Sequence, residues 1–225
     1  MGGLTGTDAL STLLPFVVSF VLAIPALTLH EWAHGWVANR LGDDTPRMMG
    51  RLSINPLRHI DPVGTLLIPA MLLLASGGTF VFGYAKPVPI NPRNFKDYKQ
   101  GMLLTGIAGP VMNIIIAVVF GLVTRVVLAV AAGSGVAMLS AIAYLLERFV
   151  LVNLGFAFFN LIPIPPMDGS RVVQRFLRGR ARQYYAMLER WGFLVVLGLL
   201  YFVPVVFDTY WSWTVIPIFR LLTGV

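Results

Sequence analysis

The sequence predicts an all-helical protein that crosses a membrane several times, and three observations support this fold class. Hydrophobic residues make up 57% of the 225-residue chain and charged residues only 12%. Soluble domains carry about 25% charged residues, so this chain has too few to cover a surface in water. The mean hydropathy is +0.78, and the apolar residues gather in long runs of the kind that form membrane-spanning helices.

Five apolar segments are expected to form the membrane-embedded part of a single domain over residues 1–225. They cover residues 10–38, 63–84, 101–132, 136–162 and 191–207. The second contains Pro69 and Gly77–Gly78, which suit a re-entrant segment. The stretch 210–222 has four aromatic residues, a proline and Arg220, which favour a position at the membrane interface. We therefore expect about five transmembrane helices, a re-entrant or extended segment and an interfacial C-terminal stretch.

Most of the charge lies in three basic loops between these segments. The loops cover residues 40–60, 86–100 and 169–190. Basic loops of membrane proteins face the cytoplasm, so all three are expected on that side. The net charge of +7 is then explained by contact with anionic membrane lipid, and a nucleic-acid partner is not predicted.

A polar motif interrupts the first apolar segment. His30 and His34 are four residues apart with Glu31 between them, and on a helix this spacing puts both imidazoles on one face. His-Glu-x-x-His is the pattern in which two histidines bind zinc and the glutamate acts as general base. The alternative is a pair of buried histidines bonded to the backbone. Ionisable residues in an apolar span are costly and are usually functional, which favours the metal site.

A catalytic zinc ion usually takes a third protein ligand. The chain has no cysteine, and the remaining histidine, His59, lies in a loop where a plain polar role is the better interpretation. Asp168 follows the prolines that end the fourth segment, where irregular backbone must be buried or line a cavity. Capping of the next helix is an equally good explanation for Asp168.

Topology provides a second argument for Asp168. If segment 63–84 crossed the bilayer, Asp168 would emerge about 30 Å from His34, on the opposite face. If that segment enters and returns on one side, Asp168 comes back beside the histidines. The same choice places all three basic loops in the cytoplasm, so charge and metal geometry favour the same topology.

Three motifs together resemble the site-2 protease family of intramembrane zinc metalloproteases. They are HEWAH at 30–34, AGPVMN at 108–113 and NLIPIPPMDG at 160–169. The phrases GRLSINPLRHIDPVGT and GYAKPVPINPRNFK resemble its compact prokaryotic members, which lack PDZ and CBS domains. The resemblance covers about residues 27–175. It implies that His30, His34 and Asp168 bind one Zn²⁺ per chain and that Glu31 is the catalytic base. It also implies a multi-pass cell-membrane enzyme, open to the cytoplasm, that cleaves transmembrane proteins.

Two asparagines are candidates for positioning the substrate. Asn113 and Asn160 lie in apolar segments, where an amide requires a partner, and either could donate to the oxygen of the reacting carbonyl. An interhelical hydrogen bond is an equal alternative for Asn113, and Asn153 is interpreted as a packing residue. The stretch 79–89 reads as extended chain and is predicted to offer an edge to an unwound substrate, or else to form a structural lip.

Two other function classes deserve comparison. A membrane zinc transporter would also place His and Asp in its spans, but it would not need Glu31 beside His30. A non-catalytic relative that only binds zinc would most readily have lost Glu31. The presence of this glutamate favours an endopeptidase.

Overall fold

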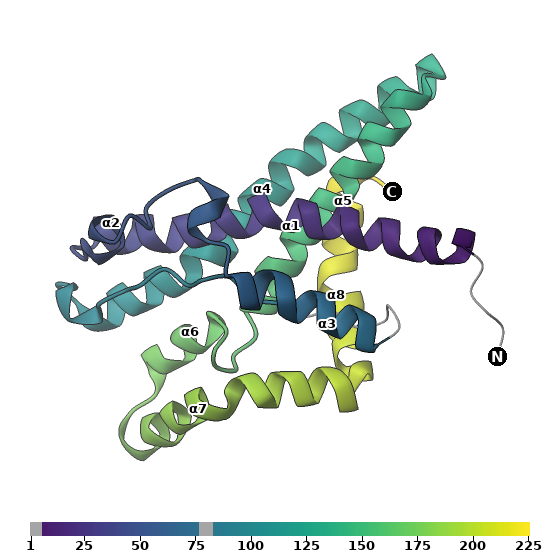
Figure 1. Ribbon diagram of the computed structural model, residues 1–225. Coiled ribbons are helices and arrows are strands. Elements are labelled where there is room, and N and C mark those ends of the chain that lie inside the picture. The colour runs from purple at the N-terminus through teal and green to yellow at the C-terminus, as the bar shows by residue number, and fades with distance from the viewer. Residues whose placement is uncertain (1–5, 77–82) are drawn as a thin grey trace.

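The computed structural model describes residues 6–76 and 83–225, and the fold is helical over these residues (Figure 1). The α-helices are α1 (Gly6–Arg40), α2 (Thr45–Met48), α3 (Ile68–Ala75), α4 (Tyr98–Ser134), α5 (Ala137–Asn160), α6 (Gly169–Phe176), α7 (Gly179–Phe202) and α8 (Pro204–Thr223). Short helical turns lie at η1 (Pro56–Arg58), η2 (Pro62–Leu67) and η3 (Pro92–Asn94). No strand occurs in the described ranges, and the predicted all-α class is confirmed.

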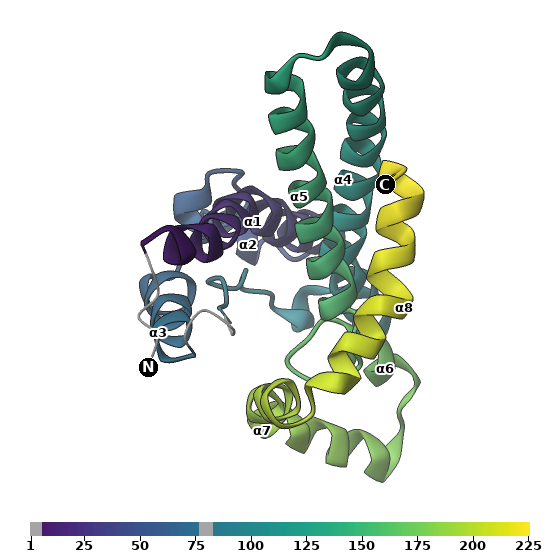
Figure 2. The same cartoon turned by 90° about the vertical axis from the view of Figure 1, so that its right-hand side faces the viewer.

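Helices α4 and α5 form a long antiparallel hairpin that supports α1 and α8 (Figure 2). Gly135 joins the two helices with φ +66°, a left-handed conformation that glycine adopts without strain. Two buried apolar clusters hold the neighbours in place. The first joins α1 to the hairpin through Ala26, Ile116 and Phe149, and the second joins α8 to it through Ala117, Val150, Leu154 and Val215.

Three described helices are long and apolar enough to cross a membrane. They are the part of α1 from Leu14 to Arg40, α4 and α5. Helix α7 is a fourth candidate, but it bends by 67° between Gly192 and Leu194. These helices indicate a membrane protein. The expectation of about five spans is not confirmed, because among the described helices only these three, or four with α7, are both long and apolar enough.

The second apolar segment returns to the place where it starts. Its helical part, Pro62–Ala75, is a short apolar helix, and Gly77–Gly78 fall outside the described residues. The backbone N–H of Tyr84 donates to the carbonyl of Gly64 at 3.0 Å, and the Thr65 hydroxyl donates to the carbonyl of Tyr84 at 2.8 Å. Because its two ends are bonded to each other, the segment starts and finishes at one point, in agreement with the expected re-entrant course.

The C-terminal stretch differs from the expectation of an interfacial segment. Helix α8 runs along the hairpin instead of lying apart from it (Figure 2). The Tyr210 hydroxyl donates to the carbonyl of Phe158 at 2.9 Å, and Arg125 Nε donates to the carbonyl of Leu222 at 3.0 Å. Tyr210 thus binds near the C-terminal end of α5, and the C-terminal end of α8 is bound by an arginine of α4.

Candidate metal centre

Three buried side chains from distant parts of the chain converge where α1 passes the first half of α4. His30 and His34 lie one turn apart on α1, and Asp168 immediately precedes α6. Their exposed fractions are 3%, 5% and 7%. The two Nε2 atoms are 3.0 Å apart, and each is 3.1 Å from Asp168 Oδ2. The structure therefore brings together the three candidate zinc ligands named from the sequence, in a group that could hold a metal ion.

The outer nitrogen of each imidazole faces a fixed acceptor. His34 Nδ1 lies 2.6 Å from the backbone oxygen of Thr105, and His30 Nδ1 lies 2.6 Å from Asn113 Oδ1. A carbonyl oxygen can only accept, so both Nδ1 atoms carry hydrogen. In the neutral rings the Nε2 atoms then keep their lone pairs, which is the tautomer that a metal requires.

The orientation of Asn113 is itself fixed by a chain of bonds across α4 and α5. Its amide nitrogen donates to the carbonyl of Ala26 at 3.2 Å and to Asn153 Oδ1 at 2.9 Å. Asn153 in turn donates from Nδ2 to the carbonyl of Phe149 at 2.8 Å. Both asparagines are fully buried. Backbone carbonyls, which can only accept, thus determine which atom donates in each hydrogen bond from Phe149 to His30.

The geometry of the three inner atoms fits zinc. Ligand atoms about 2.0–2.1 Å from a tetrahedral zinc ion are roughly 3.3 Å apart, close to the separations found here. Two imidazole nitrogens and one carboxylate oxygen form a ligand set that zinc peptidases use, with the fourth position left open. Gly109 supplies the space, because a Cβ at this position would lie 2.5 Å from Nε2 of both His30 and His34.

Asp168 is held by a close approach of two backbone segments rather than by a regular helix. The irregular chain from Leu161 carries three prolines and leads into α6 at Gly169. A Cβ on Gly169 would lie 2.2 Å from the carbonyl oxygen of Leu161, so only glycine permits this fold-back. Asp168 accepts no capping bond from α6 through its side chain, and its carboxylate is directed at the histidines.

Glu31 borders the same cavity as the metal-binding group. The cavity has a volume of about 140 Å³ and is lined by His30, Glu31, His34, Pro87, Val88, Ile90, Asn160, Pro166, Asp168 and Arg171. Glu31 Oε2 accepts a hydrogen bond from the backbone N–H of Val88 at 2.9 Å. The carboxylate predicted to act as base is therefore held in place by the irregular chain that follows the re-entrant segment.

The two candidate substrate-positioning asparagines take different places. Asn160 lines the cavity, and one of its amide hydrogens goes to the carbonyl of Phe156 at 3.0 Å. Asn113 lies behind His30, where both of its amide hydrogens are already donated. Its contacts match the interhelical alternative. Sequence reasoning did not find the link from Asn153 through Asn113 to His30, although an amide in each of two apolar helices was a signal for it.

His59 lies outside the metal-binding group and has the loop role expected for it. Its Nε2 lies 2.7 Å from the backbone oxygen of Ser53, and its own carbonyl accepts from the N–H of Lys86 at 2.9 Å. Arg51 Nη2 donates to the backbone oxygens of Lys86 and Pro87. These bonds fix the chain just before Val88, and they connect the first basic loop to the second.

Asp43 anchors the far end of this irregular chain. The fully buried carboxylate accepts from Thr45 N at 3.1 Å, Thr45 Oγ1 at 2.5 Å, Asn91 N at 2.7 Å and Asn94 Nδ2 at 2.8 Å. Burial alone would raise the pKa of Asp43, but these hydrogen bonds outweigh it and hold the pKa below its usual range. The first two basic loops are joined at this carboxylate.

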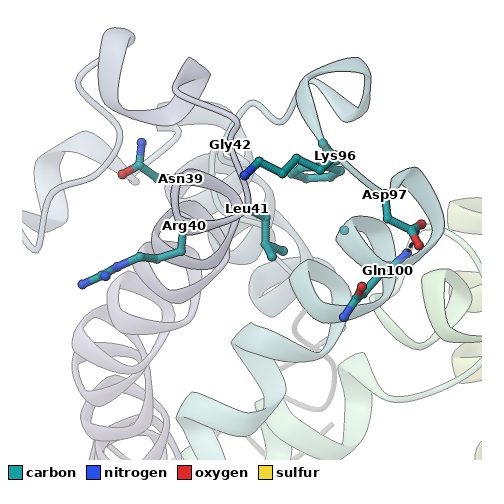
Figure 3. Close-up of a pocket in the computed structure, with 9 residues that line it drawn as sticks. Asn39, Arg40, Leu41, Gly42, Lys96, Asp97 and Gln100 are labelled. Atoms are coloured by element: carbon teal, nitrogen blue, oxygen red, sulfur yellow. Dashed lines mark hydrogen bonds between the residues drawn. The ribbon is translucent and has the colours of Figure 1, made fainter.

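A larger hollow lies at the surface beyond the end of α1 and is separate from the metal cavity. Its volume is about 320 Å³, and it is lined by Asn39, Arg40, Leu41, Gly42, Phe95, Lys96, Asp97, Gln100 and Gly101. Figure 3 shows the Lys96 side chain reaching across it toward Gly42. It shares no lining residue with the metal cavity, so size alone does not identify the chemical site.

Comparison with known proteins places this chain in a family. Residues 125–203 match the model of peptidase family M50. The chain is 38% identical to the "Putative zinc metalloprotease YwhC" of Bacillus subtilis (strain 168) over 192 residues, which cover 84% of this chain and 81% of that protein. The chain belongs to peptidase family M50. It is thus a zinc-dependent protease, and the resemblance to site-2 proteases is confirmed.

Other relatives agree with this M50 assignment. A protein of Mycolicibacterium smegmatis, Rip2, described in the same words as YwhC, is 31% identical over 207 residues, or 88% of this chain and 74% of the relative. Zinc metalloprotease MJ0392 of Methanocaldococcus jannaschii is 27% identical over 173 residues, or 76% of this chain and 38% of the relative. No solved structure matches the chain significantly.

The bond from His30 to Asn113 predicts a measurable effect on metal binding. Replacing Asn113 by Ala leaves His30 Nδ1 without its acceptor, and zinc affinity should fall about 10- to 100-fold, as for other residues that orient a metal ligand. Competition with a chelator measures this affinity. Thr124→Val removes a buried polar group on the same helix, bonded only to the carbonyl of Phe120, and should leave zinc affinity unchanged. Equal affinities in both variants would contradict the prediction.

The bonds to Asp43 predict a pH-dependent loss of stability. Because the folded pKa is lowered, the stabilisation is present above the unfolded pKa of about 3.9 and is lost as pH falls through the folded value. Asp43→Asn should therefore lower the free energy of unfolding at pH 7 by about 1–3 kcal/mol, and the gap from wild type should shrink toward pH 3. Thermal unfolding in detergent at several pH values measures this gap.

The neighbouring residue provides the control for this measurement. The exposed Asp44 accepts at Oδ1 from Asn39 Nδ2, so Asp44→Asn should change stability little at any pH. A gap between wild type and Asp43→Asn that stays constant from pH 7 to pH 3 would show that the ionised carboxylate is not the source.

Proposed function

We propose that this zinc protease hydrolyses peptide bonds within or near the transmembrane segments of membrane proteins, with Glu31 as general base. The observation that carries the proposal is the position of the metal-binding group. His30 and His34 lie on α1, inside the stretch Leu14–Arg40 that is apolar and long enough to cross a membrane. A protease site on such a helix is most readily reached by substrates that are themselves in the membrane.

In this proposal His30, His34 and Asp168 hold the zinc ion. The ion supplies Lewis acidity that activates water and polarises the scissile carbonyl. Glu31 takes the proton from the attacking water on a carboxylate oxygen and later delivers it to the nitrogen of the leaving amine. The bond from Val88 N–H to Oε2 orients the carboxylate and leaves Oε1 as the proton acceptor.

Asn160 is the asparagine that remains a candidate for binding the substrate. It borders the cavity, and the second hydrogen of its amide is not used by the carbonyl of Phe156. In our proposal it donates this hydrogen to a carbonyl oxygen of the bound peptide. Asn113 contributes from behind, by holding His30 in its metal-binding tautomer.

The irregular chain from Gly83 to Asn91 is proposed as the surface that the unwound substrate follows. Residues 79–82 of the predicted extended stretch lie outside the described residues. In the described part, the N–H groups of Tyr84, Lys86 and Val88 bind Gly64, His59 and Glu31. Pro87 and Pro89 have no N–H. In our proposal the N–H groups of a substrate strand donate to carbonyl oxygens on the opposite edge, where Pro87 also accepts from Arg51.

The active site is proposed to open to the cytoplasm. Asp43 on the first basic loop binds Asn91 and Asn94 on the second. The pKa of Asp97 on the second loop is lowered mainly by the bond from Gln100 N–H, and in addition by the positive charge of Arg175 on the third loop. The three basic loops therefore meet at one end of the molecule, which is expected to face anionic cytoplasmic lipid. Helix α8, with 20 residues, is about 30 Å long. With α7 it would raise the spans to about five in one domain, 1–225.

Replacement of the base tests this function directly. Glu31→Gln keeps the size of the side chain but cannot take a proton, so cleavage of transmembrane substrates should fall by at least about 100-fold. Zinc content should stay at one ion per chain, because Glu31 is not among the ligands. Accumulation of uncut membrane proteins in cells, compared with wild type, measures the loss.

The matched control for the base is Glu147→Gln on α5, outside the metal cavity, which should retain full cleavage. Glu31→Gln that still cleaves would overturn the role of the base. Zinc transport by the wild type that survives Glu31→Gln, with no cleavage in either protein, would instead favour the transporter alternative.

The orientation is testable because the chain has no cysteine. Single cysteines replacing Arg47, Lys96 and Arg178 sample the three basic loops, and Ser134→Cys samples the tip of the hairpin (Figure 1). In intact cells an impermeant maleimide should label only the cysteine at 134, and the loop positions only after the cells are opened. Labelling of a loop position from outside would contradict the proposed topology.

A further inference from the structure

Arg171 is a positively charged residue of the metal cavity that neither the motif nor the mechanism above uses. It lies three residues after Asp168, in the first turn of α6, and its side chain lines the cavity with His30, Glu31 and His34. Its Nη1 is buried and has no hydrogen-bond acceptor among the described residues. A buried donor without an acceptor is costly, and a guanidinium can only donate. The described residues therefore leave donor capacity of this cavity-lining side chain unused.

Packing fixes the Arg171 side chain relative to the metal ligands. Its stem lies against α4 at Gly106, where a Cβ would come within 2.8 Å of Arg171 Cβ and 3.1 Å of Cδ. The preceding residue, Thr105, holds His34 through its carbonyl oxygen. The backbone N–H of Arg171 also donates to the carbonyl of Asp168 at 2.9 Å. The same short stretch of α4 thus positions a metal ligand and this arginine, so the guanidinium is ordered before any substrate binds.

The charge of the cavity indicates which acceptor fits. The carboxylates of Asp168 and Glu31 together balance the two positive charges of a zinc ion, and Arg171 adds one more. Peptide hydrolysis places one negative charge on the oxygen of the attacked carbonyl. An unwound transmembrane segment has few charged side chains, and the acceptors that it brings are its backbone carbonyl oxygens. A carbonyl oxygen that gains negative charge is the partner that matches both the donor and the charge.

We propose that Arg171 is a substrate-binding residue, whose guanidinium donates to a backbone carbonyl oxygen of the substrate at the cleavage position. This inference rests on the proposed function of the site. Together with the second amide hydrogen of Asn160, which the bond to Phe156 does not use, it would give the peptide two donors on the wall of the cavity. The two donors come from opposite ends of the loop that carries Asp168, so the loop would position ligand and substrate together.

The test uses the full-length, zinc-loaded enzyme in detergent and a pooled set of synthetic transmembrane peptides. Each peptide has an apolar core of about 20 residues around a central pair of helix-breaking residues. Arg171→Met keeps the stem that packs on Gly106 but removes the donors. We expect kcat/KM to fall about 10- to 100-fold, mostly through kcat because the bond strengthens as charge develops. Arg171→Lys, which restores one charged donor, should recover part of the loss.

Two further measurements separate this role from a structural one. Zinc content and affinity of Arg171→Met should equal those of wild type, since Arg171 is not a ligand. In the Glu31→Gln background, where peptides bind without turnover, Arg171→Met should weaken peptide binding several-fold. Arg175→Met is the matched control, because this exposed arginine lies one turn further along α6 and outside the cavity. It should change none of these values.

The outcomes are distinguishable. If wild type cleaves the peptides and Arg171→Met cleaves them equally well, the inference is wrong while the proposed function stands. Loss of zinc from Arg171→Met would also overturn it, by showing that the arginine maintains the position of Asp168. A wild-type enzyme that binds zinc but cleaves none of the peptides would refute the proposed function, and the inference with it.

Discussion

The convergence of three lone pairs on one point is the constraint on which the rest of the structure depends. Two imidazole nitrogens and a carboxylate oxygen lie 3.0–3.1 Å apart in a buried site, where they would repel one another without a cation. The chain holds them there with bonds to the outer face of each ring, from a backbone carbonyl for His34 and from Asn113 for His30. The crossing of α1 and α4 and the fold-back before α6 together bring these three atoms to one point.

The second organising feature is the irregular chain between Gly83 and Asn91. It connects the re-entrant segment to α4 and is bonded along its length to the first basic loop and to Glu31. Irregular backbone beside an apolar core is tolerated where its polar groups are satisfied. Here the N–H groups of Lys86 and Asn91 are satisfied by the first basic loop, and that of Val88 by Glu31. The bond from Val88 therefore fixes both the wall of the cavity and the orientation of the base.

The site could be read from the sequence more completely than the fold. Spacing of His30 and His34 follows directly from helix geometry, and the topology argument correctly placed Asp168 beside them. The span count could not be predicted with the same success, because hydropathy does not distinguish a crossing from a return. The bonds between Gly64 and Tyr84 that close the re-entrant segment join residues with no distinctive pattern. Arg171 and the link from Asn153 through Asn113 to His30 were not predicted, because they depend on contacts with α4 between residues at least 40 positions apart in the sequence.

The amide relay from Phe149 to His30 has a consequence for how the helices can move. In this relay the bond from Asn113 to Asn153 joins α4 to α5 and forms at one axial offset of the two helices, while the bond from Asn153 to Phe149 lies within α5. Shifting α5 by a single residue would replace Asn153 with a neighbour that points about 100° away, and one amide hydrogen of Asn113 would lose its acceptor. The buried asparagine pair therefore fixes the register of the hairpin and, through Asn113, the orientation of the His30 ring.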